Sequence, residues 1–222
     1  MSIARPRLAV SGRLLAWLAL VGVQIVLNYA SRASGGKPDR NAVYHWSTSG
    51  GALLFYGVFF GLVLAISRER TRELLALRRP RSWAAAARLA AGVIVAVIVI
   101  EVALEPALHA NREQGLTPKH WEPAHAGAFA ASFVVLVLVG PFVEEATFRG
   151  LGFSLIVPYG QVLAVVGTGV LFGLAHGLIE ALPVLVALGI GLAFLRARSD
   201  SLYPCFVVHA LFNALALTLA VA

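Results

Sequence analysis

Long apolar runs alternate with short polar segments along this chain, and most runs are close to the length of a membrane crossing. A helix needs about 20 apolar residues to cross the hydrocarbon core of a bilayer. This pattern predicts about seven transmembrane spans, with roughly six to eight as the range. Because lipid offers the backbone no hydrogen-bond partners, the expected fold is an all-α helical bundle. The predicted spans are residues 13–30, 48–66, 84–104, 124–156, 161–178, 181–196 and 203–221.

The fourth span, 124–156, is too long for one simple crossing, and it contains Gly140-Pro141. Proline removes a backbone donor and clashes with the preceding turn, so we expect this span to be kinked or divided there. The fifth span is rich in glycine, which predicts close helix packing or room for a peptide. These glycines are at positions 167, 169, 173 and 177.

Composition favours a single integral membrane domain over residues 1–222. The chain is 59% hydrophobic with a mean hydropathy of +0.82, whereas soluble domains are about 45–50% apolar. The net charge of +7 does not indicate nucleic-acid binding, because the arginines concentrate near the N-terminus and in segment 67–88, as in cytoplasmic loops. We therefore expect a multi-pass protein of a bacterial cytoplasmic membrane, surrounded by membrane lipid, with its first span retained as a signal anchor.

Three charged residues interrupt the fourth span: Glu144, Glu145 and Arg149. Each charge near the bilayer centre costs about 2.5–3.5 kcal/mol, so the group needs a compensating partner or a function. Glu145 and Arg149 are four residues apart, which places them on one helix face as an ion pair. Glu144 is rotated by about 100° from Glu145 and lacks that partner, so it is the candidate general base. The alternative is a buried charge network that only holds helices together.

Two histidines, His176 and His209, lie in apolar spans further along the chain. His176 follows Phe172 by four residues and His209 precedes Asn213 by four, so each pair shares a helix face. Alone, such a histidine is more often a hydrogen-bonded core residue than a ligand. Together with Glu144, however, two imidazoles and an amide could activate a water, donate to an oxyanion or hold a metal. Zinc on His176 and His209 is an acceptable but not a diagnostic reading of this set.

These residues resemble the motifs of the CPBP intramembrane proteases, the family of CAAX prenyl endopeptidases and bacteriocin-processing (Abi-type) membrane proteins. The motif E-E-x-x-x-R is present at residues 144–149, F-x-x-x-H at 172–176 and H-x-x-x-N at 209–213. All three occur in the order of the family and in a membrane context. The resemblance covers residues 124–216.

The resemblance implies an intramembrane endopeptidase of glutamate or metallo type that cuts a peptide or protein substrate. In it, Glu144 activates the attacking water, and His176 helps to hold that water or a metal. His209 and Asn213 complete the site, as oxyanion donors. The other motif residues have supporting parts: Glu145, Arg149 and Phe172.

Two other functions compete with this hypothesis. A non-catalytic immunity or scaffold protein of the same family would be expected to have lost Glu144 or a histidine, and neither is lost. A proton-coupled transporter would also use glutamate and histidine inside the membrane. No inverted repeat is visible in the sequence, which counts against a transporter. Whether a substrate is prenylated stays open.

Overall fold

The computed structural model describes residues 10–35, 39, 41–108, 113, 118 and 120–221. The segment before residue 10 and parts of the loops 31–47 and 105–123, where some of the predicted loop charges fall, lie outside the described residues. Within the described ranges the regular structure is helical, without a strand. The α-helices are α1 (Gly12–Ala33), α2 (Trp46–Ser67), α3 (Thr71–Leu74), α4 (Trp83–Leu108), α6 (Ala126–Val134), α7 (Gly140–Glu145), α8 (Phe153–Ile156), α9 (Gln161–Leu174), α10 (Leu182–Ser199) and α11 (Tyr203–Val221). Shorter segments are the 3-10 turns Ala42–Tyr44, Arg68–Arg70, Pro123–His125 and Val157–Tyr159 and the π-helical segments Val135–Val139 and Ala146–Gly152.

In the described part of the chain, six helical stretches are long and apolar enough to cross a membrane. A further apolar helix, α9, has 14 residues and is shorter than a full crossing. These elements correspond to the seven spans predicted from the hydrophobic pattern. The predicted all-α bundle is therefore confirmed.

The fourth predicted span is one continuous helical stretch, Pro123–Tyr159, of 37 residues, so the chain is not divided at Gly140-Pro141. A π-helical turn precedes this dipeptide, and the Gly140 N–H donates to the Val135 carbonyl five residues back. Pro141 has no N–H to continue that register. In this five-residue register, the next carbonyl, that of Leu136, would accept from the N–H of residue 141. Because residue 141 is proline, the Leu136 carbonyl is left for a partner outside the helix.

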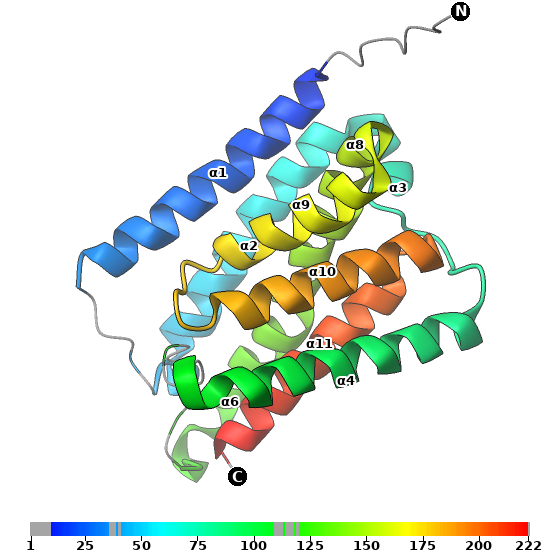
Figure 1. Ribbon diagram of the computed structural model, residues 1–222. Coiled ribbons are helices and arrows are strands. Elements are labelled where there is room, and N and C mark those ends of the chain that lie inside the picture. The colour runs from blue at the N-terminus through cyan, green and yellow to red at the C-terminus, as the bar shows by residue number, and fades with distance from the viewer. Residues whose placement is uncertain are drawn as a thin grey trace, which may run out of the picture.

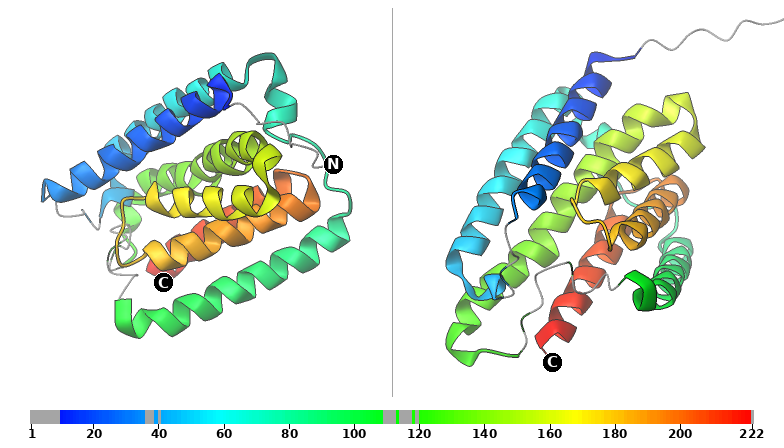
Figure 2. Two further views of the ribbon diagram at one scale, coloured as in Figure 1. Left: turned by 45° about the horizontal axis from the view of Figure 1, so that its top comes forward. Right: turned by 60° about the vertical axis from the view of Figure 1, so that its left-hand side comes forward.

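The helices pack as an elongated bundle whose two edges are formed by different parts of the chain (Figure 1, Figure 2). α1 and α2 lie side by side along one edge, and α4 forms the opposite edge. The long span, α9, α10 and α11 lie between these edges, and α10 contacts α4, α9 and α11. Trp17 of α1 is fully buried, and its Nε1 donates to the Thr147 carbonyl of the long span at 2.9 Å. The first helix is thus part of the core that holds the middle of the long span.

α9 and α10 touch where each helix carries a glycine. A Cβ on Gly189 would lie 2.5 Å from the Gly169 carbonyl oxygen, and a Cβ on Gly169 would lie 2.7 Å from the Ile190 nitrogen. Small residues allow this approach of two backbones in membrane helices. The close packing predicted for the glycines of the fifth span is confirmed at Gly169, Gly173 and Gly177. At Gly167 an added Cβ would meet nothing within 4 Å, and the alternative of room for a peptide stays a prediction there.

A charged turn fixes the end of α10 at Asp200. Its Oδ1 accepts hydrogen bonds from Arg78 at 2.6 Å and from Arg196 at 3.1 Å. Partial burial works to raise the pKa of Asp200, but the hydrogen bonds and charges of the two arginines outweigh it, so the pKa lies below its usual value. The chain after α3 is thereby tied to the turn between α10 and α11.

Replacing Gly189 with alanine should destabilise the protein by about 1–3 kcal/mol, because the added methyl group meets backbone that cannot move aside. Gly167→Ala, in the open part of α9, is the matched control, and it should leave the stability unchanged or slightly raised. Thermal unfolding in detergent measures both variants. Equal unfolding temperatures would show that the two backbones do not touch at this crossing.

Replacing Asp200 with asparagine should lower the unfolding temperature at neutral pH. Asp200 adopts a left-handed conformation (φ 56°), which asparagine tolerates, so the substitution removes the charge alone. A carboxylate whose folded pKa is lowered stabilises the protein above its unfolded pKa, and this contribution is lost as the pH falls through the folded pKa. The unfolding temperatures of wild type and variant should therefore converge at acidic pH, once the pH has fallen through the lowered pKa of Asp200. A difference that stays constant down to that pH would contradict the ionic role.

Candidate functional site

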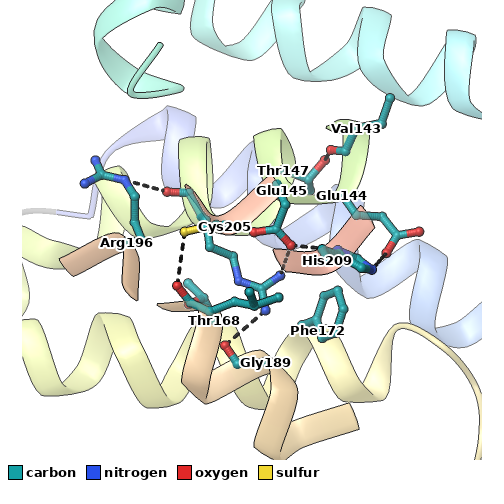
Figure 3. Close-up of polar contacts among 12 residues, drawn as sticks. Val143, Glu144, Glu145, Thr147, Thr168, Phe172, Gly189, Arg196, Cys205 and His209 are labelled. Atoms are coloured by element: carbon teal, nitrogen blue, oxygen red, sulfur yellow. Dashed lines mark hydrogen bonds and ion pairs between the residues drawn. The ribbon is translucent and has the colours of Figure 1, made fainter. Parts of the chain in front are cut away.

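Glu144 lies near the middle of the long span and faces α11 and the turn after α9. Its Oε2 is 3.8 Å from His176 Nε2 and 3.8 Å from His209 Nε2. Figure 3 shows the Glu144 carboxylate and the His209 ring turned toward one another. The Glu144 side chain is 17% exposed, so a small molecule can reach it. The structure thus brings together three of the four residues that the sequence predicted to be catalytic.

His176 lies in the turn that follows α9. Its Nδ1 is 2.7 Å from the Phe172 carbonyl, so Nδ1 carries the hydrogen and Nε2 is left to face Glu144. The first helix supports this turn, because Asn28 Nδ2 of α1 donates to the Ala175 carbonyl at 2.5 Å. The position of this imidazole therefore depends on a helix that lies outside the sequence motifs.

His209 lies on α11 and is almost fully buried. Its Nδ1 is 2.9 Å from Glu145 Oε1, so the N–H donates to that carboxylate. A carboxylate that accepts from one ring nitrogen fixes the orientation of the imidazole. It also fixes the tautomer, so the other nitrogen carries a lone pair in the neutral ring. Glu145 therefore orients His209 in addition to pairing with Arg149, a link that residue spacing could not show.

In their neutral forms, both imidazoles present lone pairs on Nε2 to the Glu144 carboxylate. The separations of 3.8 Å are too long for direct hydrogen bonds. A water lying off the line between two such atoms can be about 2.8 Å from both. An arrangement of three acceptors favours a donor between them, and a water molecule supplies two O–H donors.

The ion pair predicted from the four-residue spacing lies beneath this site. Arg149 Nη1 donates to Glu145 Oε1 at 2.8 Å, and both side chains are 0% exposed. Arg149 Nη2 also donates to the Gly189 carbonyl at 3.0 Å. Its guanidinium carbon is 4.1 Å from the centre of the Phe172 ring. The buried charges are therefore compensated by each other, by backbone and by an aromatic face.

Phe172 packs against both histidines and against the guanidinium of Arg149. Its ring centre is 4.7 Å from that of His176 and 5.5 Å from that of His209, and both pairs meet edge to face. The Phe172 side chain is fully buried. One buried ring thus contacts both imidazoles and the cation of the ion pair.

Asn213 does not meet Glu144. Its Nδ2 donates to the Leu136 carbonyl at 2.8 Å, which is the carbonyl that Pro141 leaves without a helical donor. Asn213 follows His209 by one helical turn, so this bond fixes α11 against the long span close to the imidazole. The motif predicted an oxyanion donor at Asn213, whereas its hydrogen bond in the structure joins two helices.

Tyr56 of α2 contacts Glu144 and was missed in the sequence analysis. Its hydroxyl donates to Glu144 Oε1 at 2.9 Å. A tyrosine in an apolar helix carries no motif, so only the three-dimensional arrangement reveals it. Tyr56 also lines an apolar groove of about 380 Å³ between α2, the long span and the start of α11, whose other walls include Leu53, Phe60, Phe142 and Phe206.

The two histidines were also considered as zinc ligands. Among the residues that the structure describes, no group of three histidine, cysteine, aspartate or glutamate side chains is found that could hold a metal ion. Zinc on His176 and His209 stays a prediction from the sequence.

Comparison with known proteins adds one match. Residues 126–215 match the family model described as type II CAAX prenyl endopeptidase Rce1-like. The matched segment extends from α6 into α11 and contains Glu144, His176 and His209, whereas Asn28 and Tyr56 precede it. No curated protein and no solved structure matches the chain.

Replacing Glu145 with glutamine should destabilise the protein by about 3–5 kcal/mol, because the buried Arg149 charge loses its partner. The Glu69–Arg13 pair offers a matched control, since its members are 73% and 30% exposed. Glu69→Gln should leave the unfolding temperature unchanged. Thermal unfolding of both variants in detergent makes the comparison. A Glu145→Gln protein as stable as wild type would mean that Glu145 does not neutralise Arg149.

Proposed function

We propose that this chain, whose residues 126–215 match the family model of Rce1-like type II CAAX prenyl endopeptidases, hydrolyses a peptide bond with a water activated by Glu144. The observation that carries the proposal is the convergence of two imidazole nitrogens on one carboxylate oxygen, each at 3.8 Å. General-base hydrolysis requires a base and a held water at one point. The enzyme is thus an intramembrane endopeptidase with a site made of side chains from the long span, the turn after α9 and α11.

In the first step, Glu144 Oε2 takes a proton from the water as its oxygen bonds to the carbonyl carbon of the substrate. His176 Nε2 accepts the other hydrogen of that water, because its own proton is held on Nδ1 by the Phe172 carbonyl. The water is therefore oriented with a lone pair toward the carbonyl carbon. A carboxylate and an imidazole placed in this way contribute about 10²–10⁴-fold through proton transfer.

His209 is the proposed partner of the developing oxyanion. Its imidazolium form, which takes its second proton from solvent before the substrate binds, donates from both ring nitrogens, from Nδ1 to Glu145 at 2.9 Å and from Nε2 into the site. A carboxylate behind the ring stabilises such an imidazolium, as in hydrolases that use a carboxylate–histidine pair. When the carbon–nitrogen bond breaks, the proton held by Glu144 passes to the leaving amine, which restores the base.

Glu145, Arg149, Phe172 and Asn213 are proposed to hold these groups in place. Glu145 and Arg149 fix the His209 ring from behind, and Phe172 spaces it from His176. Asn213 bonds to the Leu136 carbonyl, so its proposed part is to fix α11 rather than to bind the oxyanion.

The substrate is proposed to be a peptide segment in contact with membrane lipid. The apolar groove beside Tyr56 opens next to the base and presents almost no polar surface. A peptide with apolar side chains gains by leaving water for such a surface. Prenylated and unprenylated peptides of the same sequence are both suitable probes.

The rival function is a non-catalytic immunity or scaffold protein of the same family. Such a protein needs the buried ion pair for packing but has no use for a half-open carboxylate that faces two imidazoles. The exposure of Glu144 and the inward direction of both Nε2 atoms therefore favour the enzyme.

Replacing Glu144 with glutamine should lower the rate of peptide cleavage by about 10²–10⁴-fold and leave the unfolding temperature unchanged, because the amide keeps the shape of the base but cannot take the proton. The assay uses purified protein in lipid vesicles with prenylated and unprenylated peptides, and cleavage is followed by mass spectrometry. Glu101→Gln, which alters a glutamate of α4 remote in sequence from the motifs, is the control and should retain activity. Cleavage by the Glu144→Gln protein at the wild-type rate would rule out the proposed base, and a wild-type protein that cuts no peptide would favour the scaffold.

A further inference from the structure

The two oxygens of the Glu144 carboxylate have different surroundings. Oε2 faces the two imidazoles, whereas Oε1 accepts the hydrogen bond from the Tyr56 hydroxyl at 2.9 Å. In the described part of the chain, the titratable groups that face this carboxylate from neighbouring elements are Tyr56, His176 and His209. One oxygen is thus held by a donor, and the other is free to take a proton from water.

Gly140 creates the space through which Tyr56 reaches the carboxylate. A Cβ at this position would lie 2.8 Å from the phenolic oxygen and 2.9 Å from the ring carbon that bears it. Gly140 precedes Glu144 by four residues, so the gap and the carboxylate are on the same face of the long span. Any side chain at position 140 would displace the phenol from the base.

Tyr56 differs from the buried Tyr44 in the group that accepts the hydrogen bond of its hydroxyl. The Tyr44 hydroxyl donates to a backbone carbonyl, that of His120, at 3.0 Å. Such a bond serves packing. The Tyr56 hydroxyl donates instead to the side chain on which the proposed reaction depends.

We propose that Tyr56 is the positioning residue for the catalytic base and that Gly140, which has no side chain, leaves the space that the Tyr56 phenol requires. This inference rests on the proposed function of Glu144. The phenol holds Oε1, so the carboxylate cannot rotate, and Oε2 stays directed at the water between the imidazoles. The hydrogen bond also stabilises the ionised carboxylate, which is the form that acts as a base.

Tyr56→Phe removes only the hydroxyl and tests the proposal directly. The turnover number should fall about tenfold or more, because a hydrogen bond to a charged group is lost, while KM changes little. The lowered turnover number with an unchanged KM distinguishes a role in positioning the base from a general loss of packing. Tyr44→Phe is the matched control and should leave the turnover number and KM unchanged.

Gly140→Ala provides a second variant in which the hydroxyl is present but displaced. It should lower the turnover number as Tyr56→Phe does, and it should lower it no further in the Tyr56→Phe background, because both changes act through one hydrogen bond. Gly61→Ala in α2, where a Cβ meets nothing within 4 Å, is the control for a methyl group added to a helix.

The outcomes separate the two proposals. If Glu144→Gln is inactive while Tyr56→Phe and Gly140→Ala keep the wild-type turnover number, the role of Tyr56 is overturned and the proposed function stands. If Glu144→Gln is fully active, the proposed function fails and the role of Tyr56 fails with it. A lower turnover number in both single variants, without further loss in the double variant, supports the inference.

Discussion

The buried ion pair between Glu145 and Arg149 is the interaction on which the rest of the structure depends. Both side chains are 0% exposed, and the same glutamate oxygen also accepts the His209 N–H. Removing either charge would leave the other buried without a partner. The long span, α10 and α11 are therefore linked through one polar centre, since Arg149 also donates to Gly189 of α10. The catalytic groups proposed here are arranged on top of this centre.

Two adjacent glutamates consequently have opposite surroundings. Glu145 faces inward and is compensated, whereas Glu144, one residue earlier, is turned to the half-open side and is 17% exposed. A helix turns by about 100° per residue, so a dipeptide of two identical residues can serve structure with one side chain and chemistry with the other. His209 joins the two environments, because its Nδ1 donates to Glu145 and its Nε2 faces Glu144. Phe172 packs against both the Arg149 guanidinium and the two imidazoles.

The sequence predicted those parts of the site that depend on local spacing. The four-residue separations gave the Glu145–Arg149 pair and the shared face of Phe172 and His176, and the hydrophobic pattern gave the seven spans. Contacts between distant helices could not be predicted. Tyr56 and Asn28 lie in apolar helices without a motif, and their partners are known only once the bundle is packed. The bond from Asn213 to Leu136 depends on a π-helical register around Gly140-Pro141, whereas a kinked or divided span was expected.

The order in which the chain enters the membrane follows from where the site residues lie along it. Asn28 and Tyr56 come first, Glu144 follows in the long span, and His209 arrives with α11. A growing chain that has inserted as far as the long span therefore contains the proposed base without the imidazoles that face it. The proposed hydrolysis needs all three groups, so it can begin only after α11 has docked against the long span, and an unfinished molecule would not cut the proteins inserted beside it.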